Sequence, residues 1–132
     1  MLKNKKDLLL LLGRVLLSAI FLFSAYSKMI NIPDTVAYME SAGLGGGVVL
    51  AWVAALIELL GGLMLLLGLC ADKAALVLAV YLLVVSCFFH LEITEGTQTF
   101  HLLKNLAIIG GLLNVVASGG GSYTLKKHGC CN

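Results

Sequence analysis

The chain has 132 residues, of which 60% are hydrophobic and only 12% are charged, and its net charge at pH 7 is +2. An average soluble domain carries about 25% charged residues, so this composition excludes an ordinary water-soluble globular protein. The small net charge gives no reason to expect a nucleic-acid partner.

Four apolar stretches follow one another along the chain, and each is long enough to cross a bilayer. A helix rises about 1.5 Å per residue, so about 20 apolar residues span the hydrocarbon core. The stretches are Leu8–Ile30, Val48–Leu69, Ala74–Leu91 and Phe100–Ser118. We therefore predict an all-α fold, a four-helix bundle embedded in the lipid bilayer. Residues 1–118 form this domain, and residues 119–132 form a cytoplasmic tail with little indication of order.

The connections between the spans are too short to hold a domain outside the membrane. Pro33 ends the first helix, because the residues before a proline avoid helical geometry. The segment Asp34–Ser41 is predicted to form a short amphipathic helix that Asp34 caps and that lies on the outer surface. Any catalytic or binding site must therefore lie in the bundle or on its rim.

The distribution of the lysines predicts the orientation in the membrane. Lysines precede the first span, occupy the second connection and follow the last span. They are Lys3, Lys5, Lys6, Lys73, Lys126 and Lys127. The first and third connections contain acidic residues but no lysine or arginine between the helix ends. The positive-inside rule then places both termini in the cytoplasm.

Two oppositely charged residues lie deep in neighbouring spans. Counted from the span ends, Glu58 is about 15 Å from either face and Arg14 is about 9 Å from the cytoplasmic edge. Glu58 also shares a helix face with the small residues Ala51, Ala55 and Gly62, where a neighbouring helix approaches most closely. We predict an Arg14–Glu58 ion pair. A purely structural pair and a part in a proton or substrate path both remain open, because buried ionisable groups serve either purpose.

A second set of polar residues gathers near the outer ends of the spans. It predicts a cationic, hydrogen-bonding ligand pocket, with Glu58 reaching it from below. The residues of this pocket are Lys28, Glu58, His90, His101, Lys104 and Asn105. An anion or a quinone-like carbonyl would suit such a pocket. His90 and His101, with Glu92 as a third ligand, are a weak metal pattern, so we expect no metal.

Several segments of the chain resemble the DoxX family. They are GRVLLSAIFLFSAYSK (13–28), YMESAG (38–43), ALIELLGGLMLLLG (55–68), FFH (88–90) and KNLAIIGGLL (104–113). The resemblance keeps the order of these motifs over nearly the whole chain. It implies a multi-pass protein of the bacterial inner membrane with a loose connection to redox chemistry. It assigns no catalytic residue, and the pair Cys130 and Cys131 lies outside the family pattern.

These observations lead to one expected function and two alternatives. The expectation is a membrane component of a redox system, linked to a quinone or to sulfur chemistry, that works with a redox enzyme as partner. The sequence contains no self-contained catalytic motif, and it has no Cys-x-x-Cys pair for disulfide exchange. The first alternative is a non-catalytic scaffold for a partner enzyme. The second is a small-solute or proton carrier, which with four helices would act as a homo-oligomer.

Overall fold

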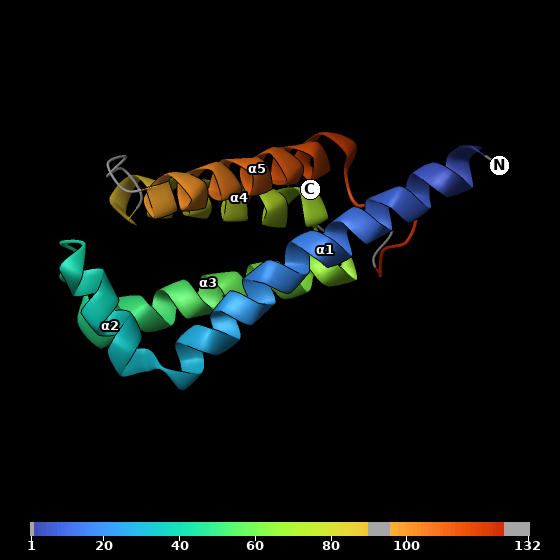
Figure 1. Ribbon diagram of the computed structural model, residues 1–132. Coiled ribbons are helices and arrows are strands. Elements are labelled where there is room, and N and C mark those ends of the chain that lie inside the picture. The colour runs from blue at the N-terminus through green and yellow to red at the C-terminus, as the bar shows by residue number, and fades with distance from the viewer. Residues whose placement is uncertain (1, 90–95, 126–132) are drawn as a thin grey trace.

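The computed structural model describes residues 2–89 and 96–125. They form five helices, labelled in Figure 1: α1 (Leu2–Ile30), α2 (Ile32–Ser41), α3 (Gly47–Leu67), α4 (Ala71–Phe89) and α5 (Gly96–Ser118). No strand occurs in these residues, so the predicted all-α fold is confirmed. Four residues that the sequence singled out, His90, Glu92, Cys130 and Cys131, lie outside the described ranges.

Four of the helices are long and apolar enough to cross a membrane, which confirms the four spans. The spanning segments are Lys3–Ile30, Gly47–Leu67, Ala71–Phe88 and Thr99–Ser118. Large apolar side chains such as Leu16 and Phe23 are each 73% exposed in the isolated chain. Such a surface is stable only where lipid covers it, as expected of a bundle in a bilayer.

The short helix α2 begins slightly earlier than predicted. It starts at Ile32 and takes in Pro33 in its first turn, where a missing N–H costs nothing. Asn31 occupies the capping position without a side-chain hydrogen bond. The prediction that Asp34 caps this helix is therefore wrong. Asp34 lies inside the first turn, where its negative charge still complements the helix dipole.

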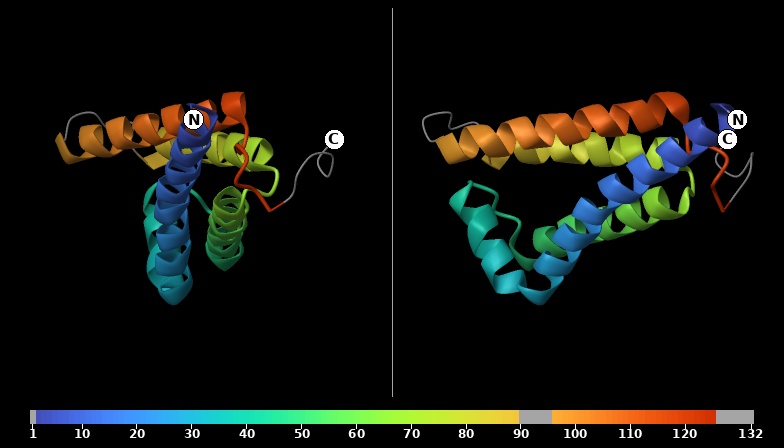
Figure 2. Two further views of the ribbon diagram at one scale, coloured as in Figure 1. Left: turned by 90° about the vertical axis from the view of Figure 1, so that its right-hand side faces the viewer. Right: turned by 45° about the vertical axis from the view of Figure 1, so that its right-hand side comes forward.

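The four long helices are arranged as two pairs. Helix α1 packs along α3, and α4 packs along α5. Contacts between α3 and α4 join the pairs. The start of α1 and the α3–α4 turn lie together at what we call the N-terminal end, and α2 lies at the opposite, α2 end (Figures 1 and 2). The two pairs are close together at the N-terminal end and diverge toward the α2 end.

Small residues allow α3 to lie between α1 and α4. A Cβ atom added at Gly61 would come within 2.7 Å of Leu78 of α4, and one at Gly62 within 3.0 Å of Leu22 of α1. Ala51 and Ala55 on the same helix are completely buried. The predicted small-residue face of this span is thus its packing face, because close backbone approach is what holds helices together in lipid.

The segment after α5 is more ordered than its sequence indicated. Ser122 donates hydrogen bonds from its backbone N–H and its hydroxyl to the carboxylate of Asp7, at 3.3 and 2.7 Å. The backbone N–H of Leu125 donates to the carbonyl of Leu67, at 3.2 Å. Residues 119–125 therefore fold back onto the N-terminal end of the bundle instead of forming a loose tail.

The cytoplasmic position of both termini remains a prediction, and reporter fusions test it. A fusion at Thr97 and a fusion after Asn132 should report opposite compartments, because four spans return the chain to its starting side. Alkaline phosphatase should be active at Thr97, and a fluorescent protein should be bright after Asn132. The same compartment for both fusions would contradict the four-span topology, and reversed activities would contradict the orientation.

Candidate functional site

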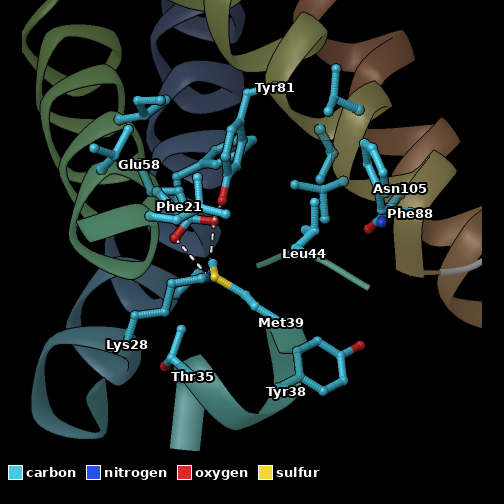
Figure 3. A pocket seen from close by; sticks show the side chains of 18 of the residues that line it. Phe21, Lys28, Thr35, Tyr38, Met39, Leu44, Glu58, Tyr81, Phe88 and Asn105 are labelled. Atoms are coloured by element: carbon cyan, nitrogen blue, oxygen red, sulfur yellow. Dashed lines mark hydrogen bonds and ion pairs between the residues drawn. The ribbon is translucent and has the colours of Figure 1, made fainter. Parts of the chain in front are cut away.

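The divergence of the two helix pairs leaves a cavity of about 380 Å³ at the α2 end. That volume lies within the usual range of small-molecule sites. All five helices and the α2–α3 connection line it, mostly with apolar side chains such as Phe21, Met39, Leu44 and Phe88 (Figure 3). The site is therefore an apolar cavity with a few polar groups and not the broadly cationic pocket that the sequence suggested.

A hydrogen-bonded network of three side chains lies on one side of the cavity. The ammonium group of Lys28 in α1 donates to both carboxylate oxygens of Glu58 in α3, at 3.0 and 2.9 Å. It also donates to the hydroxyl of Ser24, at 2.7 Å. The hydroxyl of Tyr81 in α4 donates to Oε1 of Glu58, at 2.9 Å. Figure 3 shows Lys28 and Tyr81 converging on this carboxylate.

The network is saturated as well as electrically neutral. An ammonium group has three N–H donors, and Lys28 uses all three, on Ser24 and on the two oxygens of Glu58. The Glu58 side chain is 6% exposed and that of Lys28 is 24% exposed. The polar side of the cavity therefore contributes no free positive charge.

The predicted Arg14–Glu58 ion pair does not form, because the register between α1 and α3 differs from the one assumed. Arg14 reaches the C-terminal end of α3 at Leu65, and Leu22 lies against Gly62. Glu58 lies about one turn before Gly62 on α3, so in this antiparallel arrangement it lies about one turn beyond Leu22 on α1. That position is within reach of the Lys28 side chain and far from Arg14. Depths counted from the span ends could not show this shift, because helices of unequal length need not be aligned at their ends.

Arg14 instead completes the C-terminal end of α3. Its side chain is fully buried, and it donates hydrogen bonds to the carbonyls of Leu65 and Leu66, at 3.1 and 3.4 Å. It also donates to the carbonyl of Tyr123 in the returning segment. The last carbonyls of a helix lack partners within it. Arg14 supplies partners for two of them and ties down the C-terminal segment at the same time.

Polar residues of α4 and α5 face the network across the cavity. Asn105 is 6% exposed and donates from Nδ2 to the hydroxyl of Ser86, at 3.0 Å. Ser86 in turn donates to the carbonyl of Leu82, at 2.7 Å. Lys104 is exposed and also lines the cavity. Figure 3 shows Asn105 beside Phe88, on the far side from Lys28 and Glu58.

Four of the six predicted pocket residues therefore line one cavity: Lys28, Glu58, Lys104 and Asn105. His101 does not line it; its ring packs edge-on against Phe100, with centroids 6.2 Å apart. His90 lies outside the described residues. Within the described ranges, no three His, Cys, Asp or Glu residues gather as they would around a metal ion.

The sequence reasoning missed Tyr81. The sequence did contain an indication of its role, because a hydroxyl group in the middle of an apolar span needs a hydrogen-bond partner. The helix α2 was expected to lie apart on the surface, yet its residues Thr35, Tyr38 and Met39 line the cavity. That contribution depends on how α2 folds back, which the periodicity of a ten-residue helix does not specify.

Replacing Tyr81 by phenylalanine tests whether the tyrosine only supports Glu58. Tyr81→Phe removes one hydrogen bond to Oε1 while Lys28 keeps both of its own. We expect a loss of about 1 to 3 kcal/mol in the free energy of unfolding, because a charged acceptor loses a donor. Thermal melting in detergent measures this, with Tyr26→Phe on the exposed face of α1 as the control. Equal melting of the two variants would contradict a stabilising role.

Comparison with known proteins supports the resemblance seen in the sequence. The DoxX family model matches residues 9–91. The inner membrane protein YqjF of Escherichia coli strain K12 is 30% identical over 125 residues, which are 95% of each chain. The inner membrane protein YphA of the same strain is 26% identical over 128 residues, covering 93% of this chain and 91% of YphA. No solved structure matches. With its four spanning helices, this chain is a multi-pass inner membrane protein and belongs to the DoxX family.

Proposed function

We propose that this protein is a membrane component of a redox system and that its cavity binds a lipid-soluble, quinone-like molecule. The observation that carries the proposal is the cavity itself, whose walls are mostly apolar and carry only a few polar groups. Such a site suits a molecule with an apolar body and a small polar head, because a few placed polar groups fix the orientation of a ligand in an apolar cavity.

The polar head would meet Asn105. A side-chain amide has two N–H donors, and one of them is used on Ser86. The second can donate to a carbonyl oxygen of the ligand. The Lys28–Glu58–Tyr81 network bounds the opposite side. In this role the protein binds and orients the molecule, and a partner redox enzyme transfers the electrons.

The character of the walls also favours a quinone-like ligand over a small sulfur oxyanion. A small oxyanion is strongly hydrated, and bringing it into a mostly apolar cavity would require several donors to replace its water. The three N–H donors of Lys28 are already committed. A quinone-like molecule needs only one or two donors for its head, and its body gains from contact with the apolar walls.

The carrier alternative loses its main support. It depended on Glu58 near the middle of the membrane, where a transported proton or solute would meet the carboxylate. Glu58 accepts hydrogen bonds from Lys28 on both oxygens and from Tyr81 on one, so a transported group would have to displace these partners. The scaffold alternative retains an observation of its own, because Asp34 and Glu40 are exposed on α2 and Tyr38 is 53% exposed.

A pair of matched variants tests the proposal. Val84 and Val80 both lie on α4 and are 49% and 54% exposed, but only Val84 lines the cavity. Val84→Trp should fill part of the cavity and lower the amount of quinone that copurifies by about tenfold, a loss of about 1.4 kcal/mol in binding. Val80→Trp should leave it unchanged. Mass spectrometry of extracts from protein purified in mild detergent measures the quinone.

Two results would overturn the proposal. One is the absence of any quinone from the extracts of the unaltered protein. The other is equal retention of quinone by both tryptophan variants, which would place the quinone elsewhere. If a redox enzyme copurified without quinone, the scaffold function would replace the one proposed.

A further inference from the structure

Lys104 is the one cation of the cavity that has no counter-charge in the described part of the chain. Three of the residues that line the cavity are charged: Lys28, Glu58 and Lys104. The first two form an ion pair with an N–O distance of 2.9 Å and cancel each other. The net charge of the lining is therefore +1, and it resides on the ammonium group of Lys104.

The position of Lys104 makes this charge costly. The spanning segment of α5 begins at Thr99, so Lys104 lies about 8 Å inside it, close to the depth of one turn counted from Phe100 in the sequence. A lysine in the hydrocarbon region costs a few kcal/mol unless its ammonium group reaches the headgroup region or meets an anion. Its long apolar stem lets it extend toward the nearer membrane surface.

The cavity beside Lys104 is also open to the membrane. Apolar lining residues remain exposed on both helix pairs: Ile20 is 37% and Val53 is 45% exposed on one pair, and Phe88 is 52% exposed on the other. If water filled an opening bounded by such residues, their apolar surface would stay hydrated, which is unfavourable in free energy. In a bilayer the available apolar material is the acyl chain of a lipid.

We infer that an anionic phospholipid binds at this opening, with its headgroup phosphate paired to Lys104 and an acyl chain between the two helix pairs. Charge complementarity selects the headgroup, because the described lining residues carry one uncompensated positive charge and the long stem of Lys104 can reach the surface where phosphates lie. The acyl chain covers Ile20, Val53 and Phe88. The inference goes beyond the proposed function, because a lipid at Lys104 requires neither a quinone nor a redox partner.

Native mass spectrometry with defined lipids tests the inference. The purified protein is incubated in detergent with phosphatidylglycerol or with phosphatidylcholine of the same acyl chains. We expect about tenfold greater retention of phosphatidylglycerol, which corresponds to about 1.4 kcal/mol. Lys104→Met should reduce its retention to the level of phosphatidylcholine, and Lys104→Arg should preserve it, because arginine keeps the charge and binds phosphate.

Lys73→Met provides the matched control. Lys73 is an exposed lysine at the start of α4, at the opposite end of the bundle, and it does not line the cavity. Its loss should leave phosphatidylglycerol retention unchanged. Equal retention of the two lipids by the unaltered protein, or equal loss in Lys73→Met and Lys104→Met, would overturn the inference. Thermal melting confirms that the variants fold, and the quinone content of Val84→Trp and Val80→Trp, measured without added lipid, tests the proposed function separately.

Discussion

Lys28→Met should destabilise the protein more than Glu58→Ala, although lysine is the more exposed of the two residues. Removing Lys28 leaves the carboxylate of Glu58, which is 6% exposed, without an opposite charge. Removing Glu58 leaves a lysine that is 24% exposed and whose long side chain can move toward the membrane surface. Leaving the more buried member of an ion pair without its counter-charge, as Lys28→Met does, costs on the order of 3 kcal/mol in the free energy of unfolding.

The double variant should recover part of this loss. With both charges gone, neither side chain requires a partner, so the double change should cost less than the sum of the single changes. Thermal melting in detergent gives the change in stability of each single variant and of the double variant relative to the unaltered protein. Adding Arg14→Met to Glu58→Ala serves as the comparison, and the effects of these two should be additive. Coupling between Arg14 and Glu58, or additivity between Lys28 and Glu58, would contradict the observed pairing.

The contrast between the Lys28–Glu58 ion pair, which forms, and the Arg14–Glu58 ion pair, which the sequence suggested, shows what could and could not be predicted. Hydropathy was sufficient for the four spans, because length and composition decide whether a helix can cross a membrane. The spacing of Ala51, Ala55 and Gly62 was sufficient for the buried face of α3, because that face depends only on helical periodicity. The presence of Glu58 on that face was predicted correctly for the same reason.

The partner of Glu58 depends on a different kind of information. It requires the register between two antiparallel helices, and a sliding shift of a few turns exchanges Arg14 for Lys28. Register is set by specific contacts such as Gly62 against Leu22, which a single sequence does not reveal. The cavity depends on the divergence of the two helix pairs and on the placement of α2, and neither follows from hydrophobic patterns. Four of the residues assigned to the predicted pocket line the cavity, and whether they bind a ligand remains a prediction.

The loss of Arg14 should be the most damaging single change in the molecule. The carbonyls that follow Met64 at the end of α3 need partners from outside the regular helix. Leu67 accepts from the backbone N–H of Leu125. Leu65 and Leu66 accept from the guanidinium group of Arg14. Arg14→Met should therefore leave two carbonyls without donors, at a cost of about 1 to 3 kcal/mol each.

The change should also release the C-terminal segment, because Arg14 donates to the carbonyl of Tyr123 as well. We expect a large fall in folded yield and in melting temperature, together with faster hydrogen exchange at residues 119–125. Arg14→Lys should rescue little, since one ammonium group does not reproduce the planar guanidinium group that reaches α3 and the returning segment together.

Lys73→Met, which removes an exposed positive charge from the same end of the bundle, should change neither the yield nor the exchange. If Arg14→Met behaved like Lys73→Met, the role of Arg14 as the partner of the α3 carbonyls would be wrong. If Glu58→Ala rescued Arg14→Met, the ion pair predicted from the sequence would be correct after all.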